Sequence, residues 1–203
     1  MQFTSKYPLK PYQVTNFEKI KLIIATYPLA TLISQSDPYP TVTQVPLILN
    51  DDGSALLGHV DRNNPHCERI QAGAAIYCTF HGPNHYMSPT IYPDEQYPGW
   101  NYVSVHVQGE IAAITDEPTL ADVLTKTALH NEPQESSYQL LPSQTNYQRL
   151  IKRIVGFEIR IVEIKAIVKL AQDKGSPHCE IARDHLSNVA THDISPFLHA
   201  MLE

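Results

Sequence analysis

The sequence predicts an α+β fold built around an antiparallel β-barrel. Two observations favour this class. Hairpin signals follow one another along the chain without the regular strand–helix–strand alternation that builds a parallel sheet. Residues 101–108 alternate between apolar and polar side chains, which is typical of a strand with one buried face. The glycine patterns of Rossmann and P-loop folds are absent, so a phosphate group would have to be held in another way.

The first predicted element is a helix over residues 16–27. Its apolar side chains share one face at helical spacing: Phe17, Ile20, Ile24 and Tyr27. Thr15 or Asn16 can cap its start, and Pro28 ends it.

The next residues are rich in β-branched and apolar side chains, and they predict strands over 29–34, 42–49, 55–60 and 74–80. The turn signal Asn50–Gly53 predicts that residues 42–60 form a hairpin, because Asp and Gly readily adopt the positive φ of such turns. A short helix is predicted over 65–71, ended by Gly73.

The clearest strand lies at 101–108. One face carries Val103, Val105 and Val107. The other face carries Tyr102, Ser104, His106 and Gln108, and Trp100 joins it by parity. This pattern indicates a core on one side of the strand and a site on the other.

Later segments are predicted as helices over 119–129 and 144–154, a strand over 157–170, and a last helix from Ser176. The first of these helices turns Leu120, Val123 and Leu124 inward, and the last aligns Ile181, His185 and Val189. We therefore expect one barrel domain over residues 1–175 and a helical C-terminal extension over 176–203.

The formal net charge of −6 bears on the partners. A protein that grips duplex DNA usually presents a basic face that displaces counterions from the phosphates. Here the lysines and arginines are scattered, and the densest group is Arg149, Lys152 and Arg153. No helix-turn-helix or basic recognition helix is evident. The charge argues against direct DNA binding by this chain alone.

Cysteine usage and hydropathy indicate a cytoplasmic protein. Cys67, Cys78 and Cys179 are odd in number and lack C-x-x-C spacing, so free thiols in a reducing compartment are expected. Residues 1–26 do not read as a signal peptide, because charged residues interrupt a short apolar run. No window approaches the roughly 18 apolar residues of a membrane span.

Two kinds of catalytic or metal site are disfavoured. His81 and His85 have i, i+4 spacing, but the intervening Gly82 and Pro83 break the helix that would make this spacing a zinc pair. His59 and His106 could be neighbours across strands, yet no acidic residue is spaced to complete a metal site. Neither Cys67 nor Ser88 lies in a nucleophile elbow or a Cys-His framework, so hydrolase chemistry is not expected.

Several runs carry more polar and aromatic side chains than a core requires: Pro28–Leu32, Pro46–Leu47, Gly58–Pro65, Phe80–Tyr92, Trp100–His106 and Ile154–Glu158. In order and spacing they resemble the PaiB-like family of FMN-binding negative transcriptional regulators, from about residue 7 to about residue 175. The resemblance implies a split β-barrel of antiparallel, Greek-key type with flanking helices. It also implies an FMN cofactor near the interface of a homodimer, and a role in repressing transcription.

The chemistry of FMN suggests roles for the residues of these runs. The phosphate needs cations and N–H donors, which Arg62 can supply with Asn63 and Asn64 beside it. Alternatively, these residues only close a strand and cap the next helix, a role that suits Asn64 before Pro65. Ser88 and Thr90 could add hydroxyl groups to a phosphate, or could belong to a loop shaped by prolines.

The remaining candidate residues would contact the flavin ring or its oxygens. Trp100 or Tyr102 could line the ring and His106 could bond a flavin or phosphate oxygen, or this strand could simply pack its aromatics against a helix. His59 and Asn101 lie in the same runs and complete the expected set. Lys169 and Gln172 match the family pattern and could reach the cofactor from a second subunit. Asp94 and Glu95 depart from that pattern, which has a lysine in this loop.

Two other functions remain open at this stage. One is a flavin-dependent oxidoreductase or haem-handling enzyme on the same barrel, which would need a substrate pocket beside the flavin. The other is a cofactor-free interaction protein that keeps the fold. Whether the chain is an enzyme is therefore open, and a sensor or regulator is the preferred interpretation.

Overall fold

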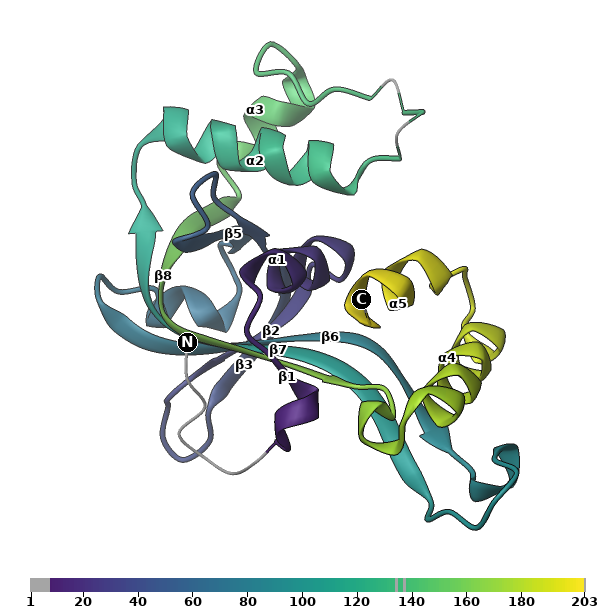
Figure 1. The fold of residues 1–203 in the computed structure, drawn as a ribbon. Helices are drawn as coiled ribbons and strands as arrows, with labels where there is room; N and C mark the ends of the chain where they lie inside the picture. The colour runs from purple at the N-terminus through teal and green to yellow at the C-terminus, as the bar shows by residue number, and fades with distance from the viewer. Residues whose placement is uncertain (1–7, 134, 137, 203) are drawn as a thin grey trace. The chain divides into compact units, whose positions relative to one another are not determined.

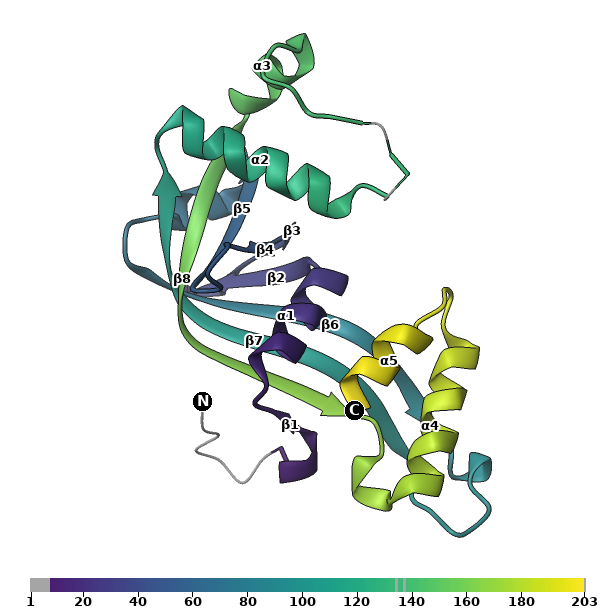
Figure 2. The same ribbon diagram turned by 45° about the horizontal axis from the view of Figure 1, so that its top comes forward.

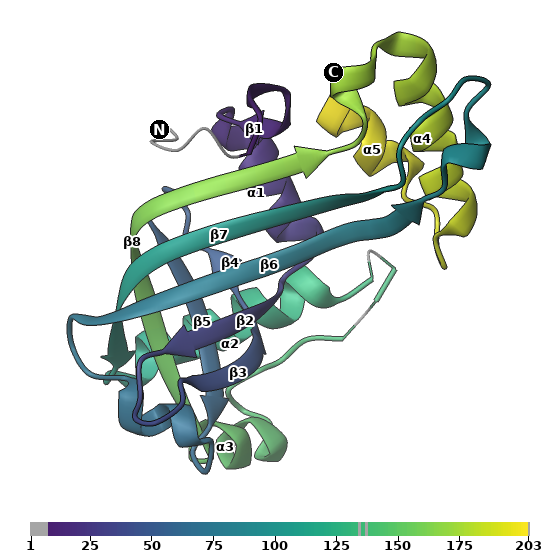
Figure 3. The same cartoon turned by 90° about the horizontal axis from the view of Figure 1, so that it is seen from below.

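A computed structural model describes residues 8–133, 135–136 and 138–202, and the statements below concern these residues. Residues 1–7 of the expected barrel domain and residue 203 of the expected extension lie outside them. The described chain combines helices with one antiparallel sheet, which confirms the α+β class. Neighbouring strands follow the order β3-β2-β6-β7-β8-β5-β4, and β1 pairs with β8. Figure 3 shows β6, β7 and β8 running side by side.

Two compact units share the chain. The central unit consists of residues 27–80 and 106–164. The terminal unit consists of the described residues up to Thr26, of His81–Val105 and of those from Lys165 onward. Strands β6, β7 and β8 contribute residues to both units.

The central unit contains, wholly or in part, the strands β2 (Leu29–Ser34), β3 (Thr41–Pro46), β4 (Ile48–Leu49), β5 (Ala55–Asp61), β6 (Ala74–Met87), β7 (Gly99–Ile114) and β8 (Ile154–Lys169). Its helices are η2 (Pro65–Arg69), α2 (Glu117–Asn131) and α3 (Thr145–Ile151). β2 pairs with β3 on one side and with β6 on the other, and β5 pairs with β8 along its whole length. The end of β5 therefore lies beside the start of β8.

Helix α2 closes one side of the central unit. Figure 1 shows it passing over β5, against which it packs. Asp116 caps its start, since its Oδ1 accepts the main-chain N–H of Thr119 at 2.8 Å. Its apolar face contributes to two buried clusters, one with α3 and one with β4 and β5: Leu120, Leu124, Tyr147, Ile151 and Ile154, and Ile48, Leu57 and Val123.

The terminal unit contains η1 (Lys10–Tyr12), β1 (Gln13–Val14), α1 (Phe17–Thr26), η3 (Pro89–Ile91), η4 (Gln172–Lys174), α4 (Ser176–Val189) and α5 (Ser195–Leu202), besides its parts of β6 to β8. Figure 2 shows α4 and α5 side by side. The Nζ of Lys19 in α1 donates to the carbonyl oxygen of Met201 in α5 at 3.0 Å. None of the helices in the described ranges has the length and apolarity needed to cross a membrane.

Most predicted elements are confirmed where a local pattern indicated them. α1 has the predicted cap at Asn16, whose Oδ1 accepts from the N–H of Glu18 at 2.9 Å. β2 has the predicted bounds, and α2 turns the predicted side chains inward. In β7, Val103, Val105 and Val107 are buried as expected, although Ser104 on the opposite face is buried too.

Two strand predictions are partly wrong, one by a break within the strand and one by its end. The strand over 42–49 is interrupted at Leu47, whose N–H donates to the carbonyl oxygen of Pro28, so β3 pairs with β2 and only β4 and β5 form the hairpin. The strand ending at Phe80 continues to Met87. Pro83 is tolerated there because the pairing with β2 ends at Phe80, so its missing N–H removes no bond from that ladder.

The helix predictions also need correction. The helix predicted over 144–154 ends at Ile151, and Ile154 already begins β8. In α4 the buried side chains are Ala182 and Leu186, whereas Val189 of the predicted face is 41% exposed. Helix α5 was not predicted separately, because eight residues show too little periodicity.

Candidate functional site

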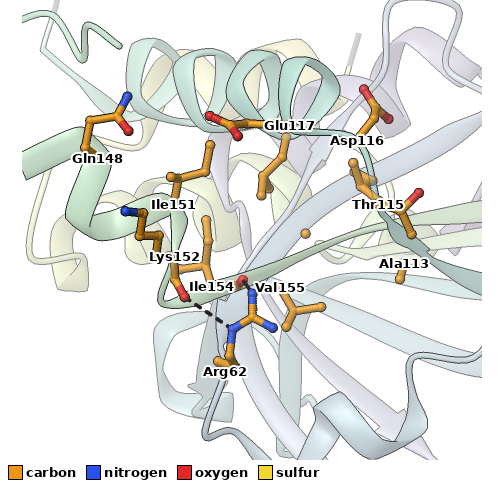
Figure 4. A pocket seen from close by; sticks show the side chains of 13 residues that line it. Arg62, Ala113, Thr115, Asp116, Glu117, Gln148, Ile151, Lys152, Ile154 and Val155 are labelled. Carbon is orange, nitrogen blue, oxygen red and sulfur yellow. Dashed lines mark hydrogen bonds between the residues drawn. The ribbon is translucent and has the colours of Figure 1, made fainter. Parts of the chain in front are cut away.

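A cavity of about 500 Å³ opens in the central unit where β5 ends (Figure 4). The ends of β7 and β8 and the helices α2 and α3 supply the rest of its lining. Much of this lining is apolar and comes from Ile114, Leu120, Ile151, Ile154 and Val155. Four charged side chains also line it: Arg62, Lys152, Asp116 and Glu117. A ligand here would meet apolar surface and charges of both signs.

Arg62 is held in place at this cavity by main-chain oxygens. Its Nε donates to the carbonyl of Lys152 at 3.3 Å, and its Nη2 donates to the carbonyl of Ile154 at 3.0 Å (Figure 4). Its main-chain N–H donates to the carbonyl oxygen of Arg153 at 2.7 Å. These two side-chain bonds use two of the five N–H donors of a guanidinium group. The remaining donors suit an anion in the cavity.

The acidic side of the cavity lies at the start of α2. The Asp116 carboxylate accepts the N–H of Thr119, and these hydrogen bonds hold the pKa of Asp116 below its usual value. Asp116 therefore stays ionised and is directed to its own helix. In Figure 4, Glu117 lies on α2 and Asp116 lies just before it, both away from Arg62. An anion would be favoured at the Arg62 end.

His59 carries a buried polar atom that lacks a partner in the described part of the chain. It lies on β5 opposite Gly156 of β8, and its Nδ1 is buried without a hydrogen bond. Burial lowers the pKa of His59 by disfavouring the charged imidazole. An unpaired buried nitrogen is costly, so a bound ligand or water is expected at this atom.

Asn63 and Asn64 bond locally. Asn63 is exposed and bonds to the carboxylate of Asp61 through both its main-chain and its side-chain nitrogen. Asn64 caps η2, since its Oδ1 accepts from the N–H of His66 at 2.9 Å and from the Thr43 hydroxyl at 3.0 Å. The capping role that the sequence left open for Asn64 is therefore present.

His106 pairs across the sheet with Tyr77. Its Nδ1 lies 2.9 Å from the Tyr77 hydroxyl, and the ring centroids are 5.9 Å apart. Both side chains are half-buried. The pair presents a polar edge on the face that the sequence assigned to a site.

Ser88 and Thr90 begin the connection between β6 and β7 in the terminal unit. The Ser88 hydroxyl accepts from the N–H of Thr90 at 3.3 Å and lies 2.8 Å from the Thr90 hydroxyl. Ser88 thus caps η3, and its hydroxyl pair faces outward on an exposed edge.

Trp100 is 52% exposed and forms an aromatic pair with Tyr86 at 6.2 Å. Its indole Nε1 donates to Asn84 at 3.2 Å. The neighbouring Asn101 is only 5% exposed, and its buried Nδ2 has no partner in the described ranges. Tyr102 is half-buried. Asn101 is the second predicted site residue with an orphaned buried nitrogen.

Lys169 and Gln172 lie at the end of β8 and just after it. The Nζ of Lys169 lies 6.0 Å from the centre of the Tyr12 ring. The side-chain amide of Gln172 bonds twice to the preceding main chain. Its oxygen accepts from the N–H of Leu170 at 2.7 Å, and its nitrogen donates to the carbonyl oxygen of Val168 at 2.6 Å. Gln172 thereby shapes the turn in which Ala171 has a φ of +66°.

The predicted residues divide between the two units. His59, Arg62, Asn63, Asn64 and His106 belong to the central unit, and Ser88, Thr90, Trp100, Asn101, Tyr102, Lys169 and Gln172 belong to the terminal unit. Of the first group, Arg62 lines the cavity. In the central unit, Arg62 fits a phosphate and the orphaned Nδ1 of His59 fits a polar ligand atom. In the terminal unit, the orphaned Nδ2 of Asn101 fits a hydrogen-bond acceptor.

Sequence reasoning missed several residues that line the cavity. Gln148 comes from α3 and Lys152 directly follows this helix, while Glu117 begins α2 and Asp116 caps it. In the sequence, Lys152 belongs to the basic group Arg149, Lys152 and Arg153, which is too small to predict DNA binding. Nothing local in the sequence indicates that it lies beside Arg62.

The chain matches a protein family and curated relatives over most of its length. The family, described as "Putative FMN-binding domain", matches residues 6–163. The chain is 31% identical over 171 residues to the protease synthase and sporulation protein PAI 2 of Bacillus subtilis (strain 168), and 81% of each chain is covered.

Two solved structures share the fold. One is a flavocytochrome from Azotobacter vinelandii, with a TM-score of 0.62, 19% identity, and coverage of 78% of this chain and 69% of the other. The other is an FAD- and haem-binding protein from Mycobacterium smegmatis, with a TM-score of 0.61, 16% identity, and coverage of 84% and 80%. At such identities the likeness concerns the fold alone, and it confirms the predicted split β-barrel.

Proposed function

This chain belongs to the PaiB-like family of FMN-binding domains, and from that premise we propose that it binds FMN as a homodimeric sensor that represses transcription through a partner. The family match confirms the resemblance carried by the motif runs and the flavin cofactor that it implied. Regulation, dimerisation and the individual contacts are the proposed part.

The observation that carries the proposal is the orientation of Arg62. Two carbonyl oxygens fix its guanidinium at a cavity of about 500 Å³, and Lys152 lines the same cavity. A phosphate dianion requires such preorganised cations, since charge-assisted bonds are the strongest that a side chain makes. Arg62 would hold the FMN phosphate, and Lys152 would add a second positive charge.

The other predicted residues would contact the rest of the cofactor. His59 and Asn101 have buried nitrogens suited to the oxygens and nitrogens of the isoalloxazine edge. Asn63, Ser88 and Thr90 offer short polar side chains, and Trp100, Tyr102 and His106 offer ring surface and hydrogen bonds. Lys169 and Gln172 would act from the second subunit. When bound, the flavin supplies reversible electron transfer, which is the signal that such a sensor would read.

Repression through a partner follows from the charge. The net charge of −6 disfavours a direct grip on phosphates. The lining of the Arg62 cavity is mixed in sign rather than basic. We therefore assign to this chain the reading of the flavin, and to a partner protein the contact with DNA.

The test uses the purified protein, loaded with FMN and desalted. A flavin absorption band is expected to survive, and Arg62→Ala is expected to weaken FMN affinity by roughly tenfold to a hundredfold, as loss of a charge-assisted pair does. Arg160→Ala is the matched control, because Arg160 lies on β8 in an exposed ion pair with Glu110. A colourless protein without saturable uptake would overturn FMN binding, and equal affinity of both variants would remove Arg62 from the site.

Two further measurements address the regulatory part. Sedimentation at micromolar concentration is expected to report a dimer. A gel shift with duplex DNA at physiological salt is expected to be negative for the protein alone, and a persistent shift would contradict repression through a partner. Steady turnover of a reductant by the flavin-loaded protein would instead assign an oxidoreductase.

A further inference from the structure

The connection between β6 and β7 is held by side chains from the C-terminal part of the chain. Residues 93–98 of this connection are irregular and contain two prolines. Most of them are exposed, and Tyr97 among them is 88% exposed. A segment of this kind is ordered mainly by what its side chains contact.

The contacts form a continuous network in the terminal unit. Nε2 of His178 in α4 lies 2.6 Å from one carboxylate oxygen of Asp94. The other oxygen of Asp94 accepts from the side-chain amide of Gln96 at 2.9 Å, and the oxygen of that amide accepts from the Nζ of Lys174 at 2.9 Å. Both ends of the network thus arise from residues 174–178, and both middle members lie in the connection.

Tyr92 is enclosed by the same two residues. The His178 ring lies 5.2 Å from the Tyr92 ring with 32° between the planes, and the Nζ of Lys174 lies 4.9 Å from the ring centre. Tyr92 is 8% exposed as a result of this packing and of its other neighbours. Two turns further along α4, His185 contacts His85 of β6 at 5.4 Å between ring centroids.

We propose that Lys174, His178 and His185, together called the C-terminal clamp, position the connection 88–98 and thereby set the affinity for FMN. This inference rests on the proposed function, because Ser88 and Thr90 begin the connection and Trp100 follows it. The three clamp residues lie beyond residue 163, where the family match ends. Lys174 and His178 contact the connection, and His185 contacts His85 of β6 just before it, so the three are positioning residues.

The chemistry of the connection makes this clamp necessary. Asp94 and Glu95 are acidic and exposed, so they bury no apolar surface that would order this segment. His178 directly, and Lys174 through Gln96, hold Asp94 in a hydrogen-bonded network, with one carboxylate oxygen directed at α4.

Trp100 provides a readout that does not depend on flavin. It is the only tryptophan in the chain and lies directly after the connection. Quenching of its fluorescence by acrylamide reports its exposure, and limited proteolysis reports the order of residues 93–98. FMN affinity is measured separately by titration.

His178→Gln and Asp94→Asn are the test variants, and His192→Gln, on the exposed turn between α4 and α5, is the control. Each test variant is expected to raise Trp100 quenching or cleavage within 93–98 at least twofold, and to weaken FMN affinity about fivefold. The double variant is expected to do no more than either single one, because the two residues share one contact.

The outcomes separate this proposal from the proposed function. If the unaltered protein takes up no FMN, the proposed function fails and so does the link between the clamp and affinity, whereas quenching and proteolysis still decide whether the clamp holds the connection. Unchanged quenching and proteolysis in both variants would overturn the clamp. Changed quenching with unchanged FMN affinity would overturn its effect on the cofactor. Should His178→Gln not fold, Lys174→Met removes the other end of the network and is judged in the same way.

Discussion

The hydroxyl oxygen of Ser34 lies 2.9 Å from Nε2 of His66, and neither side chain is more than 4% exposed. On the other side of the ring, Nδ1 lies 3.1 Å from the Thr43 hydroxyl. That hydroxyl donates its hydrogen to Asn64, so it accepts from Nδ1–H. Nε2 is then the acceptor and Ser34 the donor. The neutral imidazole satisfies both nitrogens and joins η2 to β2 and β3.

This network makes stability dependent on pH. The pKa of His66 is lowered because burial disfavours the imidazolium and Arg69 repels it. A histidine whose pKa is lower in the folded than in the unfolded state contributes its full stabilisation above the unfolded-state pKa of about 6.5. This stabilisation is lost as the pH falls from about 6.5 toward the folded-state pKa. Urea unfolding is expected to show a falling free energy below about pH 6.5, with a shallower slope in His66→Gln. Equal slopes would contradict the assignment, although His59 contributes with the same sign.

Asn64 is expected to matter for stability more than its neighbour. Asn64→Ala removes the acceptor for the His66 N–H and the Thr43 hydroxyl, and should cost about 1 kcal/mol or more, as loss of a cap does. Asn63→Ala, at an exposed site, should change the free energy of unfolding by no more than about 0.5 kcal/mol. Denaturant midpoints of both variants decide this. A similar loss of unfolding free energy in both variants would mean that the Asn64 cap does not contribute specifically to stability.

Gly109 is expected to tolerate no side chain. A Cβ there would lie 2.5 Å from Cγ2 of Ile159 and 2.7 Å from the carbonyl oxygen of Arg160, and the backbone oxygen cannot move aside cheaply. Gly109→Ala should destabilise the fold by about 1–3 kcal/mol. Gly99→Ala is the control, since a Cβ there would meet nothing within 4 Å. Thermal unfolding of the two variants gives the comparison, and equal midpoints would refute the close approach of β7 to β8.

Substitution of Asn101 tests whether this side chain contacts the ligand or only packs in the fold. Its buried Nδ2 lacks a partner, so Asn101→Leu should raise the stability of the flavin-free protein by about 1 kcal/mol and weaken FMN binding at least tenfold. Gln108→Leu, at an exposed position of the same strand, should change neither quantity greatly. Calorimetry and FMN titration measure the two effects. Unaltered affinity in Asn101→Leu would remove Asn101 from the cofactor site.

The parts of the fold that follow from local patterns could be predicted from the sequence. α1, β2 and α2 need only a cap and a run of apolar side chains at one period, and Asn16 and Asp116 supply the caps. The break at Leu47 could not be predicted, because it arises from a bond to Pro28, almost twenty residues earlier. The strand continued past Gly82 and Pro83 since tertiary pairing outweighed their turn propensity.

The candidate site shows the same division. The runs around Arg62 and Trp100 could be singled out, because they carry polar side chains that a core does not need. The cavity itself could not, since it brings together Arg62, Asp116 and Lys152 from three separate segments. Nor does sequence indicate that both side-chain bonds of Arg62 end on main-chain oxygens, which no residue type specifies.

The position of β8 has a consequence for how the chain folds. It is the last strand in the sequence, yet in the sheet order it stands between β7 and β5, and it also pairs with β1 through Gln13 and Ile167. Such pairing of distant segments requires closure of long loops and makes folding slow. While the chain is being synthesised, β5 and β1 emerge long before their partner and expose unpaired edges that favour aggregation. Productive folding must therefore wait for almost the whole barrel to leave the ribosome, and expression at low temperature or with chaperones should raise the soluble yield.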